Sequence, residues 1–155
     1  MKRWLLFSFL SLSVAVHGQL ITPKTERHIF KGEINRQGKA VGCHHIRAIS
    51  FYKTAQMISG TRVNGPYGIF KAKVKIKSAS SRWITKVSNG GYSTFFPEEW
   101  SEAKTKEEIL LAFQGKRLVS GDLYEGKCSD GWMIQFYLTD EGKIATAFPR
   151  DWTRR

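Results

Sequence analysis

Apolar and lysine side chains alternate most regularly over residues 70–77. Four apolar residues occupy the even-numbered positions and four lysines the odd-numbered ones. A period of two places the apolar set on one face of a β-strand and the four ammonium groups on the other. The pattern predicts a half-buried strand. Its lysine face is either simply solvated or follows the phosphate backbone of a polyanion.

A helix is predicted over about residues 101–114, and Gly115 follows as its C-terminal stop. Thr105 and Glu108 make a second capping box inside that segment, so the pattern leaves the first residue of the helix open. Residues 46–57 are apolar and aromatic, and fit a strand or a short helix equally well.

Four further segments have the apolar content and length of strands: residues 83–87, 118–124, 132–138 and 144–148. The turn Asp140-Glu141-Gly142 suits a hairpin between the last two. Residues 59–68 contain glycines and a proline and predict a loop, and residues 19–27 are interpreted as a polar lead-in arm. Together these elements predict an α+β fold in which antiparallel sheets predominate.

The first residues are typical of a secretory signal peptide. Lys2 and Arg3 precede a mostly apolar stretch that ends at Val16-His17-Gly18. About 13 apolar residues are too few for a membrane span, which takes roughly 20. We therefore expect a signal peptide over residues 1–18 and one domain over residues 19–155, secreted or periplasmic and free of the membrane after cleavage.

The chain is strongly basic, with a formal net charge of +12. Such a charge raises the local concentration of polyanions and speeds their capture. RNA, DNA, anionic lipid and acidic polysaccharide all qualify, and the charge does not choose among them.

Cys43 and Cys128 are the two cysteines of the chain. In an oxidising compartment an isolated pair is more often bridged than free, so a disulfide is expected. It would contribute on the order of 4 kcal/mol in the chain-entropy model. The alternative is two buried thiols. Two cysteines at this spacing do not predict a zinc site, and no metal ligands are assigned.

Three histidines follow the expected signal peptide: His28, His44 and His45, all within eighteen residues. Histidine is the side chain best suited to move protons near neutral pH. In RNA transesterification one imidazole takes the proton of a ribose 2′-hydroxyl, another protonates the leaving 5′-oxygen, and a cation stabilises the charge on phosphorus. Structural histidines or weak metal ligands are the alternatives. Motifs of serine hydrolases, P-loop enzymes, zinc peptidases and dinucleotide-binding proteins are absent from the sequence.

The local pattern around these histidines resembles the EndoU family. Residues 28–34 read His-Ile-Phe-Lys-Gly-Glu-Ile and are followed by Gly38-Lys39 and Gly42-Cys43-His44. The family motif runs His-x-Phe/Ile-x-Gly-Glu/Asp, a short turn and Gly-x-His. Coronavirus uridylate-specific endoribonucleases, animal EndoU enzymes and bacterial toxin domains carry a similar stretch.

The resemblance extends over about residues 27–152. Lys86, residues 93–97, Trp100-Ser101 and the predicted helix look like the bacterial EndoU branch, and residues 144–148 are similar to the closing strand of the family. The resemblance implies an EndoU-like catalytic domain with antiparallel sheets and a few helices.

The resemblance also implies roles. His44 would be the general base, His28 the general acid and Lys86 the cation of the transition state. The products would be a 2′,3′-cyclic phosphate and a 5′-hydroxyl, and DNA, which lacks the 2′-hydroxyl, would not be cut. No metal would be required, although manganese stimulates some members. His45 competes for the base role, but the Gly-x-His spacing selects His44. Among the many lysines, Lys71 and Lys73 compete with Lys86.

Substrate-binding residues follow from the same resemblance. Ser93 or Thr94 would contact the base and favour uracil, and Thr146 and Phe148 would contribute from the closing strand. Many members have a tyrosine where this chain has Phe148. Phenylalanine keeps the stacking face and loses the hydroxyl group, which weakens the expectation of a strict uridine preference.

A metal-binding or structural domain is disfavoured, because acidic and cysteine ligands near the histidines are few, and two function classes remain. The first is a secreted metal-independent endoribonuclease, acting as a free enzyme or as a toxin whose producer needs an immunity partner. The second is a non-catalytic, basic RNA- or polyanion-binding protein on the same fold. The trio His28, His44 and Lys86 favours the enzyme. The natural RNA and the oligomeric state do not follow from the sequence.

Overall fold

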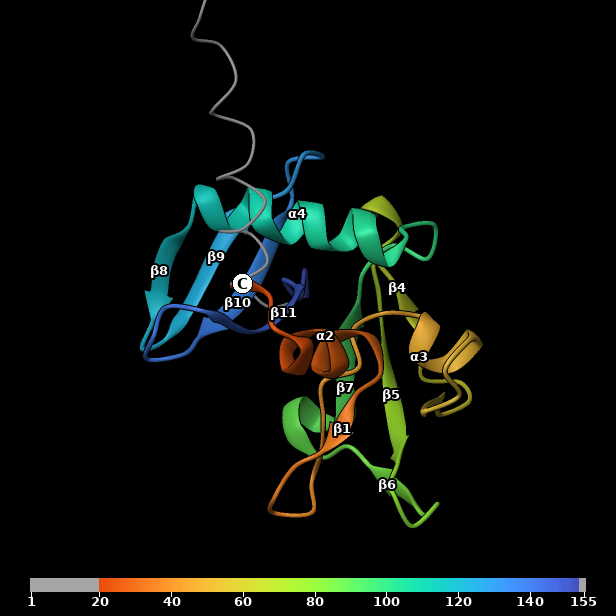
Figure 1. The fold of residues 1–155 in the computed structure, drawn as a ribbon. Helices are drawn as coiled ribbons and strands as arrows, with labels where there is room; N and C mark the ends of the chain where they lie inside the picture. Colours follow the sequence, from red (N-terminus) through yellow and green to blue (C-terminus); the bar gives the residue numbers. More distant parts are fainter. Residues whose placement is uncertain (1–19, 154–155) are drawn as a thin grey trace, which may run out of the picture.

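The computed structural model describes residues 20–153, and the predicted signal peptide lies outside them. This part of the chain has an α+β fold with antiparallel sheets of two, four and five strands. The four-stranded and five-stranded sheets stand apart, and α2 (Pro23–Phe30) lies between them (Figure 1). No helix within residues 20–153 is long and apolar enough to cross a membrane.

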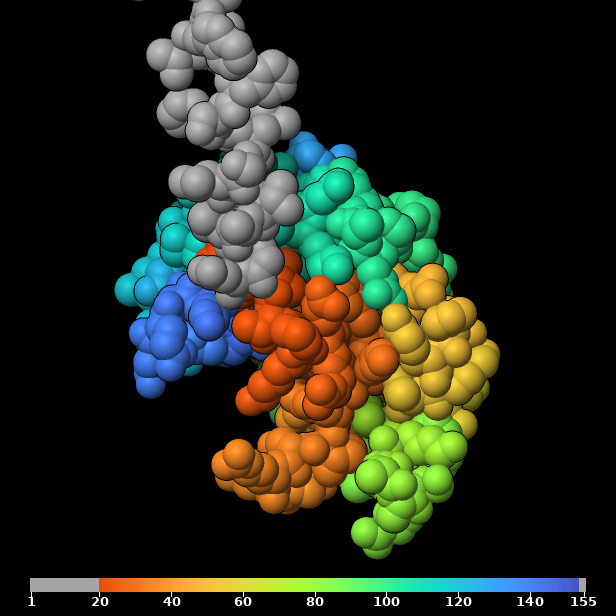
Figure 2. Space-filling view, in the orientation of Figure 1, coloured from red at the N-terminus to blue at the C-terminus, as the bar shows by residue number. Residues whose placement is uncertain are grey.

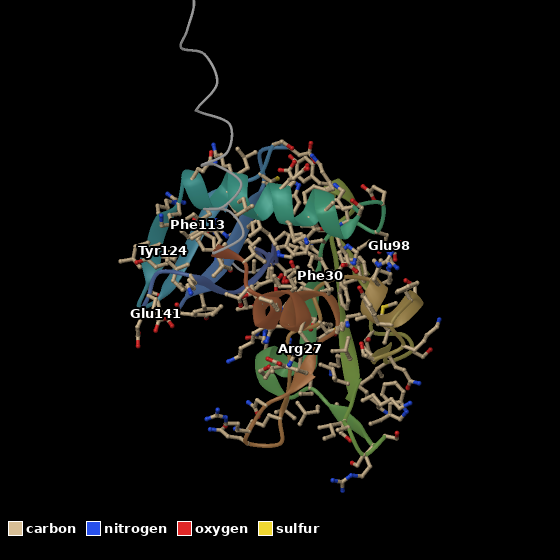
Figure 3. The ribbon with its side chains drawn as sticks, viewed as in Figure 1. Arg27, Phe30, Glu98, Phe113, Tyr124 and Glu141 are labelled. Atoms are coloured by element: carbon tan, nitrogen blue, oxygen red, sulfur yellow. The ribbon has the colours of Figure 1, made fainter. Side chains whose placement is uncertain are left out.

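The four-stranded sheet is built from the C-terminal part of the chain. Its strands, in spatial order, are β11 (Ile144–Pro149), β10 (Met133–Leu138), β9 (Leu123–Lys127) and β8 (Arg117–Ser120). Helix α4 (Glu102–Gln114) covers one face (Figure 1). Phe113 on the helix and Tyr124 on β9 both contact Phe136, with ring centroids 5.8 and 6.4 Å from it (Figure 3). These aromatic contacts belong to the hydrophobic core between α4 and the four-stranded sheet, which is the first of two cores.

The five-stranded sheet is organised around β5 (Phe70–Lys77). Its partners are β3 (Ala55–Met57), β4 (Val63–Asn64), β6 (Trp83–Thr85) and β7 (Tyr92–Phe95), and each pairs with β5 antiparallel. The alternation of residues 70–77 predicted this strand correctly, because its four apolar side chains are fully buried in the second hydrophobic core.

The remaining elements are short and connect these layers. They are the hairpin of β1 (Glu33–Ile34) and β2 (Ala40–Val41), the helix α3 (Arg47–Ser50), and the 3-10 turns η1 (Pro66–Gly68) and η2 (Ser88–Gly91). In the space-filling view α2 fills the space between the C-terminal strands and the segment around α3 (Figure 2). The segment 46–57, predicted as either a strand or a short helix, contains both: the short helix α3 and then the strand β3.

The interpretation of residues 19–27 as a lead-in arm is wrong over most of its length, because α2 begins at Pro23. Thr22 caps this helix by accepting a hydrogen bond from the Thr25 N–H, and Pro23 occupies the first position, where its missing N–H costs nothing. Ile29 and Phe30 of the same helix are buried, so tertiary packing holds this short helix in place.

Two other boundaries differ from the prediction. The segment 118–124 forms the end of β8 and the beginning of β9 instead of one strand, because Gly121 turns the chain at a φ of +52°. Helix α4 begins at Glu102, because Ser101 accepts a hydrogen bond from the Lys104 N–H and acts as the N-cap. The second capping box is not used, since Glu108 binds Ser129.

The expected disulfide is also wrong: Cys43 and Cys128 are both free. Each thiol is buried in a different hydrophobic core, Cys43 behind the five-stranded sheet and Cys128 under α4. Burial raises the pKa of the Cys43 thiol to about 12, so the reactive thiolate form is suppressed.

We therefore expect that reductant does not change the melting temperature of the folded protein. A thiol titration after unfolding without reductant should detect both cysteines, because separate cores keep them apart. A melting temperature that falls in excess reductant, together with fewer than two titratable thiols, would contradict the free-thiol arrangement.

Candidate active site

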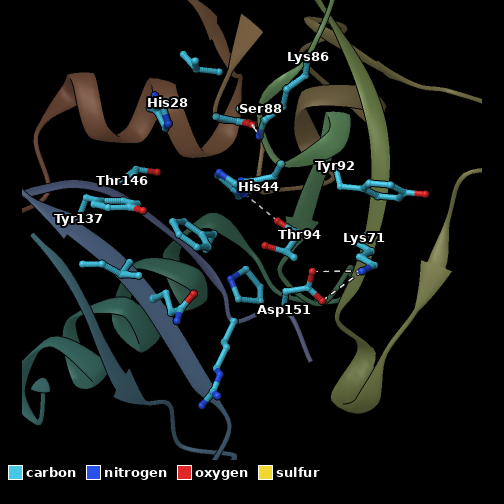
Figure 4. A pocket seen from close by; sticks show the side chains of 18 of the residues that line it. His28, His44, Lys71, Lys86, Ser88, Tyr92, Thr94, Tyr137, Thr146 and Asp151 are labelled. Atoms are coloured by element: carbon cyan, nitrogen blue, oxygen red, sulfur yellow. Dashed lines mark hydrogen bonds and ion pairs between the residues drawn. The ribbon is translucent and has the colours of Figure 1, made fainter. Parts of the chain in front are cut away.

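A cleft of about 580 Å³ lies between the five-stranded and four-stranded sheets (Figure 4). Its walls include His28 from α2, His44 from the loop after β2, and Lys86 from the segment between β6 and η2. The facing wall consists of the exposed side of β10 and β11. The three residues that the sequence selected as catalytic thus line one cleft, although they are up to 58 positions apart in the chain.

The backbone of residues 42–44 brings the two histidines together. The Cys43 N–H donates to the His28 carbonyl at 2.9 Å, and the His44 N–H donates to the Ile29 carbonyl at 2.8 Å. Gly42 makes this approach feasible: at its φ of +75°, a Cβ atom would lie 2.2 Å from the His28 carbonyl oxygen. The imidazole centroids of His28 and His44 are consequently 6.3 Å apart.

The tautomer of His44 is fixed by the backbone. Its Nδ1 lies 2.8 Å from the Thr94 carbonyl oxygen, which can only accept, so Nδ1 carries the proton in the neutral ring. Nε2 is then left with a free lone pair. The Phe148 ring stacks on His44 with a centroid separation of 5.2 Å. Burial, and then the charges of Lys86 and His28, lower the pKa of His44 well below its usual value, so the ring is neutral near pH 7.

His28 has a different environment. Its Nδ1 donates to the Glu33 carboxylate at 3.0 Å, which leaves Nε2 as its second proton site. Burial lowers the pKa of His28, while the hydrogen bond and charge of Glu33 raise it and partly offset the burial. Sequence reasoning missed this partner, although Glu33 is the acidic position of the motif itself.

These two environments give the two imidazoles different tendencies to take up a proton. The charges of Lys86 and His28 both oppose the protonation of His44, whereas His28 has an adjacent carboxylate that favours its protonation. When their environments push the pKa values of two titratable groups apart, one group can act as the base and the other as the acid. The arrangement can therefore hold a neutral His44 beside a His28 that accepts a proton more readily.

Lys86 is buried, with 4% of its surface exposed. Its Nζ donates to the Ser93 hydroxyl at 2.8 Å and to the Gly42 carbonyl at 3.2 Å, and the remaining N–H is available to the cleft. Burial lowers the pKa of Lys86 to about 8, so the amine is still mostly charged at neutral pH. The site thus offers one partly desolvated cation.

The competing residues occupy other places. His45 is buried in the core, where its Nε2 donates to the Trp100 carbonyl at 3.0 Å and its Nδ1 accepts from the Arg47 N–H at 3.2 Å. Lys71 lines the cleft, but its Nζ is bound to Asp151 at 3.2 Å. Lys73 is not part of the cleft wall.

Of the four residues predicted to bind substrate, three line the cleft and one does not. Thr94, Thr146 and Phe148 line the cleft. Ser93 instead lies behind the wall: it is buried and donates to the Gly42 carbonyl at 3.0 Å while accepting from Lys86. Ser93 therefore orients the lysine in this structure and has no hydroxyl proton free for a base.

Sequence reasoning missed two cleft residues on β10, Gln135 and Tyr137. They alternate with the fully buried Ile134 and Phe136, so the period of the strand places them on the face away from the core. That signal was present in the sequence, but only the position of the sheet shows that this face borders the cleft.

No cluster of three or more histidine, cysteine, aspartate or glutamate side chains able to hold a metal ion occurs in the described range 20–153. The independence of the reaction from metal remains a prediction. The groups that are present can take up a proton, deliver a proton and stabilise an anion within one cleft.

Comparison with known proteins identifies the family. The profile described as bacterial EndoU nuclease matches residues 22–151, which includes every residue of the cleft. The chain belongs to the bacterial EndoU nuclease family. The resemblance seen in the histidine motif is thereby confirmed over nearly the whole described domain.

The chain is also similar to two known proteins. A protein named toxin from Bacillus cereus strain ATCC 14579 is 35% identical over 136 residues, which are 87% of this chain and 24% of that protein. The EndoU chain therefore spans about a quarter of the length of this relative. The endoribonuclease Nsp15 of Middle East respiratory syndrome coronavirus aligns with a TM-score of 0.46 and 12% identity, over 80% of this chain and 33% of the viral one.

The close contact at Gly42 gives a prediction on stability. Gly42→Ala should lower the free energy of unfolding by several kcal/mol, because the new methyl group collides with the His28 carbonyl. Gly38→Ala is the matched control: Gly38 has a similar φ of +73° with no atom within 4 Å, so only the backbone cost of about 1–2 kcal/mol applies. Urea unfolding of the two variants measures both. Equal losses would contradict the close approach.

Proposed function

We propose that this EndoU protein is a secreted endoribonuclease that cleaves single-stranded RNA by attack of the ribose 2′-hydroxyl on the adjacent phosphate. One observation supports this most: a neutral imidazole with a fixed tautomer, a carboxylate-bound imidazole and a buried ammonium group line the same cleft. These are the base, the acid and the cation that the reaction needs.

In the proposed reaction, His44 Nε2 takes the proton of the 2′-hydroxyl while the 2′-oxygen attacks phosphorus. The remaining N–H of Lys86 stabilises the negative charge that develops on the phosphoryl oxygens. His28 Nε2 donates its proton to the departing 5′-oxygen. The products are a 2′,3′-cyclic phosphate and a 5′-hydroxyl, and the two histidines end with exchanged protonation states. No step requires a metal ion, and manganese would act only as a stimulant.

The alternative of a non-catalytic polyanion binder explains the net charge of +12 equally well. It does not explain the burial of Lys86 and His44 beside each other. Burying an ammonium group and lowering the pKa of a neighbouring imidazole costs stability, whereas a phosphate-binding surface works with solvated cations. Titratable groups whose pKa is shifted by burial in a cleft favour catalysis.

A biological setting can be proposed from the same family. The Bacillus cereus relative is named a toxin, so a toxin role for this chain is proposed, with an immunity partner that protects the producing cell. The pattern of residues 1–18 supports export to the periplasm or the medium. Cleavage at uridines is proposed as well, with Thr94, Thr146 and Phe148 in contact with the nucleotide.

The first test is cleavage of a short uridine-containing RNA in EDTA. The protein should produce new ends carrying a 2′,3′-cyclic phosphate. His44→Ala and His28→Ala should each lower the rate by at least about a hundredfold, as expected for loss of a general base or acid. Mass spectrometry of the products identifies the ends.

Circular dichroism and RNA-binding measurements on both variants serve as controls. Tight binding without cleavage by the wild-type protein, with or without manganese, would favour the polyanion binder. Cleavage that persists in both histidine variants would indicate a contaminating nuclease.

A second test uses the pH dependence of cleavage. His28 must be protonated to act as the acid, so activity falls as the pH rises through the His28 pKa. Glu33 raises that pKa, and Glu33→Gln should therefore move the fall in activity to lower pH. Glu26→Gln is the matched control, because Glu26 is on the same helix as His28 but pairs with Lys106. A profile of Glu33→Gln that coincides with the wild-type profile would remove Glu33 from this role.

A further inference from the structure

The cleft wall opposite the catalytic groups contains an oriented amide. We propose that Gln135 reads the base on the 5′ side of the cleaved bond and selects uracil, and that the buried carboxylate of Glu125 positions its amide. The inference rests on the proposed endoribonuclease function and names the residue that determines its base preference.

Gln135 stands next to the aromatic surface of the site. On β10 it is the cross-strand partner of Phe148 on β11, whose ring stacks on His44 with centroids 5.2 Å apart. Side chains of directly opposed residues have Cβ atoms about 5 Å apart on one face of a sheet. Gln135 and Phe148 both line the cleft. Tyr137 also lines it (Figure 4), and its ring centroid is 6.1 Å from that of Phe148. A base that stacks on Phe148 therefore has the Gln135 amide within reach.

Glu125 fixes which way that amide faces. Glu125 is the partner of Gln135 on β9, and only 4% of its surface is exposed. Its carboxylate accepts from the Arg117 guanidinium at 2.6 Å and from Gln135 Nε2 at 3.4 Å, and Arg150 Nη1 lies 3.7 Å away. A carboxylate paired with arginine accepts hydrogen bonds and donates none, so the NH₂ end of the amide must face it.

This orientation leaves a specific edge for a ligand. Gln135 Oε1 has no hydrogen-bond partner within the described residues, and one N–H of Nε2 is also unused. Uracil presents its N3–H donor beside a carbonyl acceptor, which complements an amide acceptor beside a donor. Cytosine has no hydrogen on N3, so the same position of the base would set two acceptors against each other.

The other polar groups of the site fit this role less well. The Ser93 hydroxyl donates to the Gly42 carbonyl. The Thr94 and Thr146 hydroxyls each donate and accept through a single oxygen atom, and Phe148 has no polar atom. Gln135 has its donor and its acceptor on two separate atoms side by side, and it lies directly across the strand pair from the phenylalanine that lacks the hydroxyl. The polar contact missing on β11 is thus supplied from β10.

The test compares kcat/KM on dinucleotide substrates that differ only in the 5′ base: uridine, cytidine and 3-methyluridine, which lacks the N3–H. We expect the wild-type protein to prefer uridine over both others. Gln135→Leu should reduce the uridine-to-cytidine ratio by about five- to a hundredfold, the size of one bidentate base contact, and should abolish the penalty on 3-methyluridine. Gln56→Leu, an exposed glutamine on β3 far along the other sheet, is the matched control and should leave both ratios unchanged.

Glu125→Gln tests the positioning role separately. It should lower the same ratio while the rate on cytidine changes little, since a purely structural defect would reduce all substrates alike. A uridine-to-cytidine ratio that is unchanged in Gln135→Leu, an equal loss on all three substrates, or a wild-type protein that does not discriminate would each overturn the inference while leaving the nuclease intact. A wild-type protein that cleaves none of the substrates would instead overturn the proposed function itself.

Discussion

The whole site depends on the contact between the backbone of residues 42–44 and the C-terminal end of α2. Gly42 and Cys43 both adopt a positive φ, and the collision that a Gly42 side chain would cause shows how closely the segments approach. From this segment the N–H groups bind α2, the Gly42 carbonyl accepts from Lys86, and the His44 carbonyl accepts from the Phe96 N–H. One short segment therefore connects the helix, the hairpin and the five-stranded sheet, and so fixes the distances among His28, His44 and Lys86.

Burial of these groups has a thermodynamic cost and a chemical use. Removing Lys86 and His44 from water lowers the pKa of both, which keeps His44 neutral, as the proposed base must be, but makes the charged form of Lys86 less stable. The lysine amine keeps two acceptors, so its charge is not left without partners. Glu33 counteracts burial at His28 alone. A single added carboxylate thus distinguishes two otherwise similar imidazoles.

The two walls of the cleft present different kinds of side chain. Helix α2, the loop after β2 and the segment after β6 hold the two imidazoles and the lysine that we propose as the catalytic groups, while the four-stranded sheet presents aromatic and amide side chains across the cleft. The face of β10 and β11 that α4 does not cover can border the cleft, because the opposite, apolar face of the sheet is buried against the helix.

The sequence by itself determined the α+β class, the strand over residues 70–77, the helix ending at Gln114 and the family, because periodicity and motif spacing are local properties of the chain. Only the tertiary structure decided what lies at a distance. It separated the two cysteines into different cores, turned the polar arm into α2, and placed His45 in the core beside a His44 in the cleft. These outcomes depend on which distant segments pack together, and the local sequence around each residue does not predict that packing.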